Sequence, residues 1–234
     1  MDKFGLIGYP VSHSPSPELF KAAYGGRWEY DIIENPEFEI CWQRFLDEYK
    51  GINITIPFKE KAMQRVDVIH PECALVGATN LVVKTNRGLE AHNSDILAVS
   101  HILKERFSGG GKVLVAGDGG AGKAAAAAAK SLGMETIVCN RSARAGLRPL
   151  DELPALASEA DILIYTLPCS VAGLKDIKCP CVLEANYDRP ALAWNPNVGD
   201  YIPGIVWLRL QAMLGYEFLT GIKPDIKALS RYFK

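Results

Sequence analysis

The amino-acid sequence predicts an α/β protein with two domains. Segments with the alternation typical of β-strands are interspersed with segments at helical spacing along almost the whole chain, which favours this class. A glycine-rich turn at residues 117–122 joins a short apolar strand to an alanine-rich helix, as in a parallel sheet covered by helices. The run SGGGK at residues 108–112 reads as a flexible break, so we expect a domain boundary just ahead of it.

Length and composition narrow the class of protein further. The chain has 234 residues, 48% of them hydrophobic and 23% charged, which is enough to bury a sizeable core. A formal net charge of -1 and the absence of a long basic run predict neither nucleic acid nor a membrane surface as a partner. Glycine and proline interrupt the first apolar run too early for a signal peptide, and no later run reaches transmembrane length. A cytoplasmic location is therefore expected.

The six cysteines are scattered along the chain. Only Cys179 and Cys181 lie close together, as CPC, a spacing that fits neither a zinc knuckle nor a CxxC redox pair. Free cysteine commonly packs as a small apolar residue. We therefore expect buried cysteines and no metal site.

The N-terminal half is predicted to form four strands and four helices. The first helix has Ser16 as its N-cap, Pro17 at its first position and Glu18 in its first turn, all favourable at a helix start. The third strand alternates apolar and polar residues until Pro57 ends it. The expected strands are residues 3–8, 28–33, 51–56 and 78–84, and the expected helices are residues 16–24, 36–49, 59–66 and 95–107.

The C-terminal half begins with an apolar strand, the glycine turn and the alanine-rich helix. The tail carries apolar residues at helical spacing in two segments, residues 204–221 and 225–233. Between these regions the pattern predicts further short strands. The expected strands of this half are residues 112–116, 136–139, 161–166 and 181–184.

The glycine turn carries the pattern GxGxxG, formed by Gly117, Gly119 and Gly122. In this position the glycines allow a tight turn, close approach of the backbone to a pyrophosphate, and close packing of helix on strand. The helix N-terminus would face the phosphates. The pattern therefore predicts a dinucleotide site that also includes Gly120 and Ala121, and a plain glycine-rich turn is the alternative.

The residues about twenty positions further on bear on the choice between NAD and NADP. An NAD site carries an acid there for the ribose 2′-hydroxyl, whereas the run CNRSAR has none. A guanidinium in that place would pair with a 2′-phosphate, which predicts NADP. The alternative is that the arginines are solvated loop residues. The polar residues of this segment are Asn140, Arg141, Ser142 and Arg144.

A hydride carrier needs a substrate site with a proton-handling group, and the N-terminal half must supply it. Polar side chains there collect at strand ends and loop starts, where α/β proteins place ligand groups. Most are hydroxyls and amides, which suit the orientation of a small hydroxylated substrate. The candidates are Ser14, Ser16, Asn53, Thr55, Lys59, Asn80, Asn93 and Asp95.

Seven short motifs, in order along almost the whole chain, resemble those of the shikimate dehydrogenase family. Their order is far more specific than any one of them. They are HSPSP at 13–17, NITIPFK at 53–59, GATN at 77–80, NSD at 93–95, GDGGAGKA at 117–124, NRS at 140–142 and GIVWLRLQA at 204–212.

The resemblance implies NADP-linked interconversion of 3-dehydroshikimate and shikimate, on the route to aromatic amino acids. It implies that Lys59 and Asp95 form the catalytic pair beside the hydroxyl that is oxidised. Ser14 and Ser16 would hold the substrate carboxylate. The other residues implied are Asn53, Thr55, Asn80, Tyr187 and Gln211 for the substrate, and Gly204 for the cofactor.

The same resemblance implies the division of the chain. Because Gln211 lies on the tail helix, the chain must return to the first domain. Residues 1–97, completed by residues 205–234, would form the substrate-binding domain, and residues 98–204 the Rossmann-like NADP domain. The active site would lie between the two domains. The protein is expected to be a monomer or a homodimer.

Departures from the family pattern leave alternatives open. Ile96 follows Asp95 where the family usually has glycine, residues 165–171 differ from its segment near the nicotinamide, and Glu184 stands where aspartate is usual. One alternative is an enzyme that acts on quinate or another polyol acid with NAD. Another is a binding or sensing protein that has kept both sites without turnover. Retention of both Lys59 and Asp95 favours catalysis.

Overall fold

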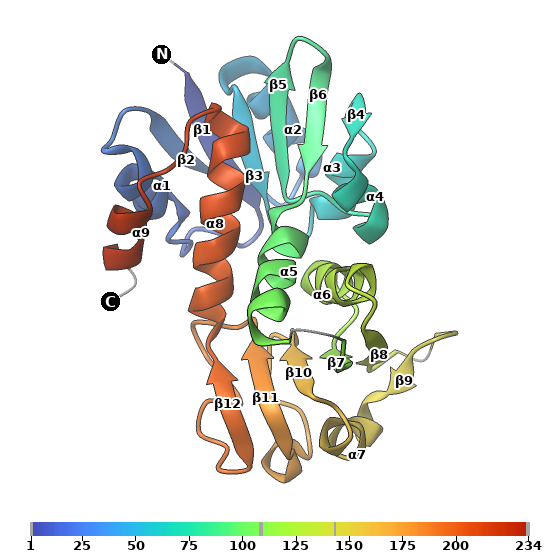
Figure 1. Cartoon of the computed structure of the whole chain (residues 1–234). Coiled ribbons are helices and arrows are strands. Elements are labelled where there is room, and N and C mark those ends of the chain that lie inside the picture. The colour runs from blue at the N-terminus through green and yellow to red at the C-terminus, as the bar shows by residue number, and fades with distance from the viewer. Residues whose placement is uncertain (1, 108–109, 143, 233–234) are drawn as a thin grey trace. The chain divides into compact units, whose positions relative to one another are not determined.

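The computed structural model describes residues 2–107, 110–142 and 144–232 (Figure 1). It divides into two compact units, one formed by Met1–Ser94 with Arg209–Lys234 and the other by Asp95–Leu208. Ser108 and Gly109 of the predicted flexible break, and Phe233 of the last predicted helix, lie outside the described residues. The predicted α/β class is confirmed, while the functional role of each unit stays a prediction.

The first unit is built on a mixed six-stranded sheet. Its strand order is β2-β1-β3-β5-β6-β4, with β2, β1 and β3 parallel and β5 antiparallel to both of its neighbours. The chain visits β2 on one side of β1 and then β3 on the other, so the winding reverses at β1. The strands are β1 (Lys3–Gly8), β2 (Glu29–Glu34), β3 (Gly51–Ile54), β4 (Val68–Ile69), β5 (Leu81–Thr85) and β6 (Gly88–His92).

Helices cover both faces of this sheet (Figure 1). One face carries a core that includes Trp42, Phe45 and Phe58, and the other an aromatic cluster that includes Phe20 and Tyr216. The helices are α1 (Ser16–Tyr24), α2 (Phe38–Glu48), α3 (Lys59–Met63), α4 (Pro71–Val76), the second part of α8 (Gly204–Thr220) and α9 (Ile226–Tyr232).

The predicted bounds of α1, residues 16–24, are confirmed, but its predicted N-cap is wrong by one residue. Pro15 occupies the N-cap position, so that Ser16 is already helical and does not act as a side-chain cap. The hydroxyl of Ser14 instead accepts the N–H of Ser16 at 3.3 Å. At the other end Gly25 adopts a left-handed φ of 61°, and its N–H donates to the carbonyl of Lys21.

The second unit contains a six-stranded parallel sheet in the order β12-β11-β10-β7-β8-β9. Numbered from β7, this is the doubly wound 3-2-1-4-5-6 arrangement of dinucleotide-binding folds, with its switch point between β7 and β10. The strands are β7 (Lys112–Ala116), β8 (Glu135–Asn140), β9 (Arg148–Pro149), β10 (Ile162–Tyr165), β11 (Cys179–Glu184) and β12 (Val198–Ile202). The helices are α5 (Ser94–Arg106), α6 (Gly120–Ser131), α7 (Leu153–Ser158), the start of α8, and the 3₁₀ turns Leu150–Glu152 and Leu174–Asp176.

Several short elements escaped prediction. β6 alternates Leu89 and Ala91 with the polar side chains of Glu90 and His92, but five residues that include glycine, alanine and glutamate have low β-propensity. β4 and β9 have two residues each. The other elements that the sequence did not predict are α4, α7 and β12.

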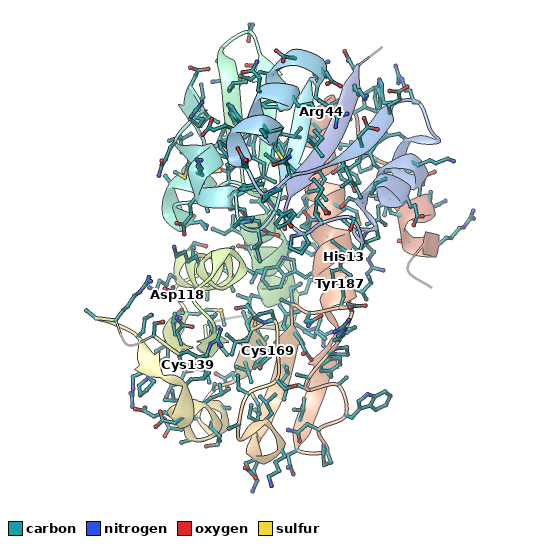
Figure 2. The ribbon with its side chains drawn as sticks, turned by 180° about the vertical axis from the view of Figure 1, so that it is seen from behind. His13, Arg44, Asp118, Cys139, Cys169 and Tyr187 are labelled. Atoms are coloured by element: carbon teal, nitrogen blue, oxygen red, sulfur yellow. The ribbon has the colours of Figure 1, made fainter. Side chains whose placement is uncertain are left out.

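The cysteines pack as expected with one exception. Five of the six are buried, whereas Cys169 is exposed on the loop after β10 (Figure 2). The residues of β10 are buried, but Cys169 lies beyond that strand and directly follows Pro168, where the apolar run ends. Among the described helices, none is both long and apolar enough to span a membrane.

The core position of Phe45 generates a prediction of stability. Phe45 is 0% exposed, so we expect Phe45→Ala to lower the free energy of unfolding by about 3–5 kcal/mol through lost contacts and a residual cavity. Ile40 lies on the same helix but is 50% exposed, and Ile40→Ala should change it by about 0.5 kcal/mol or less. Urea unfolding followed by circular dichroism measures both. Equal effects of the two substitutions would contradict the assignment of this helix face.

Candidate active site

The first unit places its predicted substrate residues where the winding of the sheet reverses. Open α/β sheets bind ligands outside the carboxyl ends of strands at such a point. β1 and β3 are parallel neighbours, so their carboxyl ends share one edge of the sheet. Ser14 lies on the loop after β1, Asn53 lies within the last two residues of β3, and Thr55 follows directly.

A chain of hydrogen bonds brings three of the predicted residues together. Asn80 donates through Nδ2 to Ser94 Oγ at 3.1 Å, and its Oδ1 accepts the N–H of Ser94 at 2.9 Å. Ser94 Oγ in turn donates to Gln211 Oε1 at 3.2 Å. Asn53 donates to the carbonyl of Asn80 at 3.4 Å. Residues from β3, the start of β5, the start of α5 and α8 therefore form one polar group.

The two serines before and within α1 join this group through tyrosines. Ser14 Oγ donates to Ser16 Oγ at 3.0 Å, and the Tyr216 hydroxyl donates to the carbonyl of Ser16 at 3.3 Å. The Tyr30 hydroxyl donates to Asn53 Oδ1 at 2.8 Å. Burial raises the pKa of Tyr30 well above its ordinary value, and the Ser16 hydroxyl opposes that shift only in part. Tyr30 is therefore a neutral donor between Ser16 and Asn53.

A carboxylate at the end of β2 fixes the loop that carries Ser14. Glu34 Oε2 accepts the N–H of Val11 at 2.7 Å and also the N–H of Ser12. The Val11 N–H is the main cause that lowers the pKa of Glu34, and the Ser12 N–H acts in the same direction. His13 lies on the same loop (Figure 2). The Glu34 carboxylate therefore fixes the loop through the backbone N–H groups of Val11 and Ser12.

The predicted catalytic residues adjoin this polar group along the backbone. Lys59 is the first residue of α3, and its carbonyl accepts the N–H of Thr79 at 3.1 Å, directly before Asn80. Asp95 directly follows Ser94 and lies in the first turn of α5, where it is 8% exposed. A carboxylate in a first helical turn is stabilised by the helix dipole. Their catalytic roles stay predictions.

Three members of the polar group were missed from the sequence. Ser94 stood inside the NSD motif and could have been found there. Tyr30 and Tyr216 gave no local signal, because their hydroxyls reach the group only through the packing of β2 and α8 against α1.

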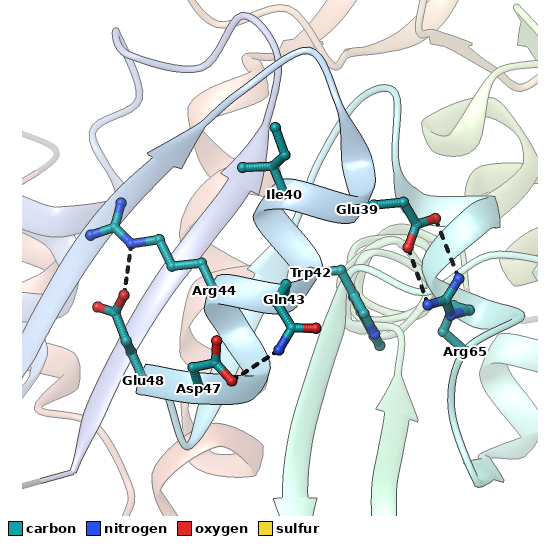
Figure 3. A pocket seen from close by; sticks show the side chains of 8 residues that line it. All are labelled: Glu39, Ile40, Trp42, Gln43, Arg44, Asp47, Glu48 and Arg65. Carbon is teal, nitrogen blue, oxygen red and sulfur yellow. Dashed lines mark hydrogen bonds and ion pairs between the residues drawn. The ribbon is translucent and has the colours of Figure 1, made fainter.

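A separate cavity of about 570 Å³ lies on the outer face of α2 (Figure 3). Its charged side chains pair with one another: Arg44 contacts Glu48 at 3.2 Å and Arg65 contacts Glu39 at 3.1 Å. It contains none of the residues that the sequence singled out. Because none of the predicted site residues lines it, this cavity is not the candidate active site.

The glycine turn of the second unit has the geometry that a pyrophosphate site needs. Gly117 has a φ of 109°, and a Cβ on Gly122 would lie 2.0 Å from the carbonyl oxygen of Gly117. A Cβ on Gly119, in contrast, would meet nothing within 4 Å. α6 begins at Gly120 with no acidic residue in its first turn. The turn is therefore tight on the helix side and open on the side where phosphates would approach Gly119, Gly120 and Ala121.

The end of β8 presents the residues predicted to select the cofactor. Asn140 ends the strand, and Arg141 and Ser142 are exposed directly after it. Arg144 lies 3.7 Å from the carboxylate of Asp118, which belongs to the glycine turn. Figure 2 marks Asp118 near this edge of the sheet. The ion pair offsets the carboxylate charge that would otherwise repel phosphate.

The segment after β10 faces the glycine turn across the switch point. Thr166 Oγ1 donates to the carbonyl of Ala116 at 2.9 Å, and a Cβ on Gly117 would lie 2.6 Å from the same hydroxyl. The Tyr165 hydroxyl donates to the carbonyl of Cys169 at 2.7 Å. Burial raises the pKa of Tyr165 above its ordinary value, so the hydroxyl remains a donor. Residues 165–171, which depart from the family pattern, therefore form an ordered turn that is hydrogen-bonded to Ala116, directly before the glycine turn.

Buried Glu184 organises the loop that carries Tyr187. Its carboxylate accepts the N–H groups of Ala191 and Leu192, at 2.5 and 3.0 Å, and the hydroxyl of Tyr201 at 2.8 Å. Tyr187 is 41% exposed on this loop (Figure 2). The substrate role predicted for Tyr187 stays a prediction, since the residue belongs to the second unit.

Gly204, predicted to contact the cofactor, has a steric reason to be glycine. A Cβ there would lie 2.5 Å from the carbonyl oxygen of Ala185 and 2.6 Å from that of Glu184. The first residue of α8 therefore packs directly against the backbone at the end of β11. Contact with a cofactor stays a prediction.

Comparison with known proteins gives a consistent result. Residues 6–82 match the family model described as the shikimate dehydrogenase substrate binding domain. The shikimate dehydrogenase (NADP(+)) of Archaeoglobus fulgidus is 30% identical over 95% of this chain and 94% of its own length.

Solved structures of shikimate dehydrogenases resemble this chain over almost its whole length. The crystal structure of Mycobacterium tuberculosis shikimate dehydrogenase superposes with a TM-score of 0.83 at 30% identity, covering 99% of this chain and 98% of that one. The structure of shikimate 5-dehydrogenase from Thermus thermophilus in complex with NADP(H) and shikimate gives a TM-score of 0.80 at 26% identity, with 99% and 98% covered. The chain belongs to the shikimate dehydrogenase family.

Proposed function

We propose that this protein is an NADP-dependent shikimate dehydrogenase, which reduces 3-dehydroshikimate reversibly to shikimate in the biosynthesis of aromatic amino acids. The observation that carries the proposal is the buried polar group that links Asn53, Asn80 and Gln211 through Ser94. Hydroxyl and amide groups at fixed positions suit a substrate with several ring hydroxyls. Family membership supplies the reaction.

The proton chemistry falls to Lys59 and Asp95. NADP, when bound, exchanges a hydride with the carbon that carries the reacting oxygen. During reduction the Lys59 ammonium gives its proton to the oxygen on which negative charge develops, and during oxidation the neutral amine takes the proton back. Asp95 is the second member of the proposed catalytic pair. Ser14 and Ser16 bind the substrate carboxylate through their hydroxyls, while Asn53, Thr55, Asn80, Tyr187 and Gln211 orient the ring.

The cofactor binds at the glycine turn of the second unit. The space beside Gly119 would accommodate the pyrophosphate, and Arg141 and Arg144 would hold the 2′-phosphate. Residues 98–204 form the NADP domain, and residues 1–97 with residues 205–234 form the substrate domain. The other residues that would contact the cofactor are Gly117, Gly120, Ala121, Gly122, Asn140, Ser142 and Gly204.

The remaining proposals concern the context of the enzyme. A net charge of -1 supports a small-molecule substrate rather than nucleic acid as the partner. We place the enzyme in the cytoplasm, as a monomer or a homodimer.

A direct assay separates this function from its two alternatives. Purified protein is mixed with shikimate or quinate and with NADP or NAD, and the absorbance of the reduced nicotinamide is followed. Activity with shikimate and NADP supports the proposal. Preference for quinate with NAD would identify the related enzyme, and silence in a folded protein that still binds NADP would identify a binding protein without turnover.

Replacement of Lys59 should remove the proton donor. We expect Lys59→Ala to lower kcat by about 100- to 10,000-fold, the range of general acid and base catalysis. Lys61 lies two residues further along α3 and pairs with Glu39 at 3.1 Å, so Lys61→Ala should leave kcat unchanged. If Lys59→Ala keeps kcat within a few fold, the catalytic assignment is wrong.

Cofactor choice should depend on the two arginines after β8. We expect the double variant Arg141→Ala and Arg144→Ala to raise KM for NADP about 10- to 100-fold, since hydrogen bonds to charged groups contribute about 1.5–3 kcal/mol, and to raise KM for NAD by less, because NAD lacks the 2′-phosphate. Arg148→Ala is the matched control, because Arg148 is bonded to Glu152. An unchanged KM for NADP would mean that Arg141 and Arg144 are solvated loop residues.

The carboxylate of Glu34 should act through the loop that carries Ser14. We expect Glu34→Gln to raise KM for shikimate several fold with little effect on kcat, because the Glu34 carboxylate orders a loop and does not touch the reacting atoms. The folded state lowers the pKa of Glu34, so the loop contact is complete above the ordinary glutamate pKa and is lost as the pH falls through the lowered value.

The control for this variant is Glu29→Gln at the opposite end of the same strand, where Glu29 pairs with Lys3 at 3.7 Å. It should leave KM for shikimate unchanged at every pH. A rise in KM that is equal in the two variants, or a fall in kcat alone for Glu34→Gln, would contradict the positioning role.

A further inference from the structure

Two of the four histidines meet on one face of the first sheet. β4 and β6 run parallel with Ile69 opposite Ala91, and the N–H of His70 donates to the carbonyl of Ala91 at 3.2 Å. His70 therefore lies beside His92 on the neighbouring strand. Their rings stack with centroids 3.9 Å apart and planes at 27°. The parallel register, rather than sequence spacing, creates the pair.

Carboxylates flank both imidazoles. Glu90 lies two residues before His92 on β6, hence on the same face, and its Oε2 is 2.9 Å from His70 Nε2. Glu72, in the first turn of α4, places Oε1 3.1 Å from His92 Nδ1. One ligand atom each from His70, Glu90 and His92 lies within 4.8 Å of the other two.

We propose that His70, Glu90 and His92 bind a divalent transition-metal ion of the zinc class. Two imidazoles and one carboxylate are a ligand set that zinc uses with an open fourth position, whereas magnesium and calcium prefer oxygen ligands alone. Bonds of about 2.0–2.1 Å to nitrogen in tetrahedral geometry require the ligand atoms to draw together by up to about 1.5 Å. The site does not depend on the proposed dehydrogenase activity.

The surroundings support the cluster as a built site. The Phe218 ring stacks on His92 at 4.2 Å and 15°, which fixes the imidazole plane. Glu90 is oriented by the hydroxyl of Thr85 at 2.5 Å and by Arg87 Nε at 3.0 Å. Such second contacts hold metal ligands in place.

Charge and access also fit a cation. Two carboxylates, Glu72 and Glu90, accompany the guanidinium of Arg87, so these three charged side chains together carry a net negative charge. The side chains of Glu90 and His92 are 6% and 9% exposed, whereas that of His70 is 28% exposed. The ion can therefore enter from the His70 side and end in a site that is largely shielded from water.

The experiment is a metal titration of the untagged full chain after removal of metals with a chelator. Zn²⁺ binding is measured by calorimetry, and Co²⁺ serves as a coloured probe whose visible spectrum reports coordination. The variants are His70→Gln and Glu90→Gln. The control is His101→Gln, because His101 also pairs with a glutamate, Glu105 at 3.3 Å, but stands outside the cluster.

We expect one ion per chain in the unsubstituted protein and in His101→Gln, and binding at least about 10-fold weaker in His70→Gln and Glu90→Gln. Unfolding temperatures without metal confirm that the variants fold. The Co²⁺ spectrum of the unsubstituted protein decides the matter even if a variant fails to fold. The proposal is overturned if that protein binds neither ion stoichiometrically, or if folded His70→Gln binds as tightly as the control.

Discussion

The structure of the first unit depends on the satisfaction of buried amide groups. Asn80 is 3% exposed, and both ends of its side chain are bonded to Ser94. A buried polar group left without its partner costs about 1–3 kcal/mol, so the start of β5 and the start of α5 are held in one register. Gly215 completes this arrangement, because a Cβ there would lie 2.9 Å from Ser94 Oγ. The same bonds that place the predicted substrate residues therefore also constrain how closely α8 approaches.

In the second unit the corresponding constraint is steric. Gly117, Gly122 and the hydroxyl of Thr166 lie so close together that a single added methyl group would collide. This tightness locks the turn between β7 and α6, while the space beside Gly119 stays open. Arg144 also pairs with the one carboxylate in the turn, that of Asp118, which reduces the negative charge at the predicted cofactor site.

The sequence predicted what local patterns encode, and the reasons for its failures are physical. The roles of Gly117 and Gly122 followed from strand, turn and helix in succession, and the geometry agrees. Contacts between distant segments left no such trace: Tyr30 reaches Asn53 only because β2 and β3 flank β1. The histidine cluster was missed for the same reason, since only the pairing of β4 with β6 brings His70 beside His92. Cys169 was predicted to be buried and is exposed because it follows the end of a buried strand.

The first unit is discontinuous in sequence, and this has a consequence for the order in which the protein can fold during synthesis. The ribosome completes Asp95–Leu208 before it reaches Arg209, so the second unit can fold as one continuous segment. The first sheet, although made earlier, must wait for α8 to cover its aromatic face and for Gln211 to reach Ser94. Until then Phe20 and its neighbours are without part of their cover. A nascent chain at this stage exposes apolar surface of the kind that chaperones bind.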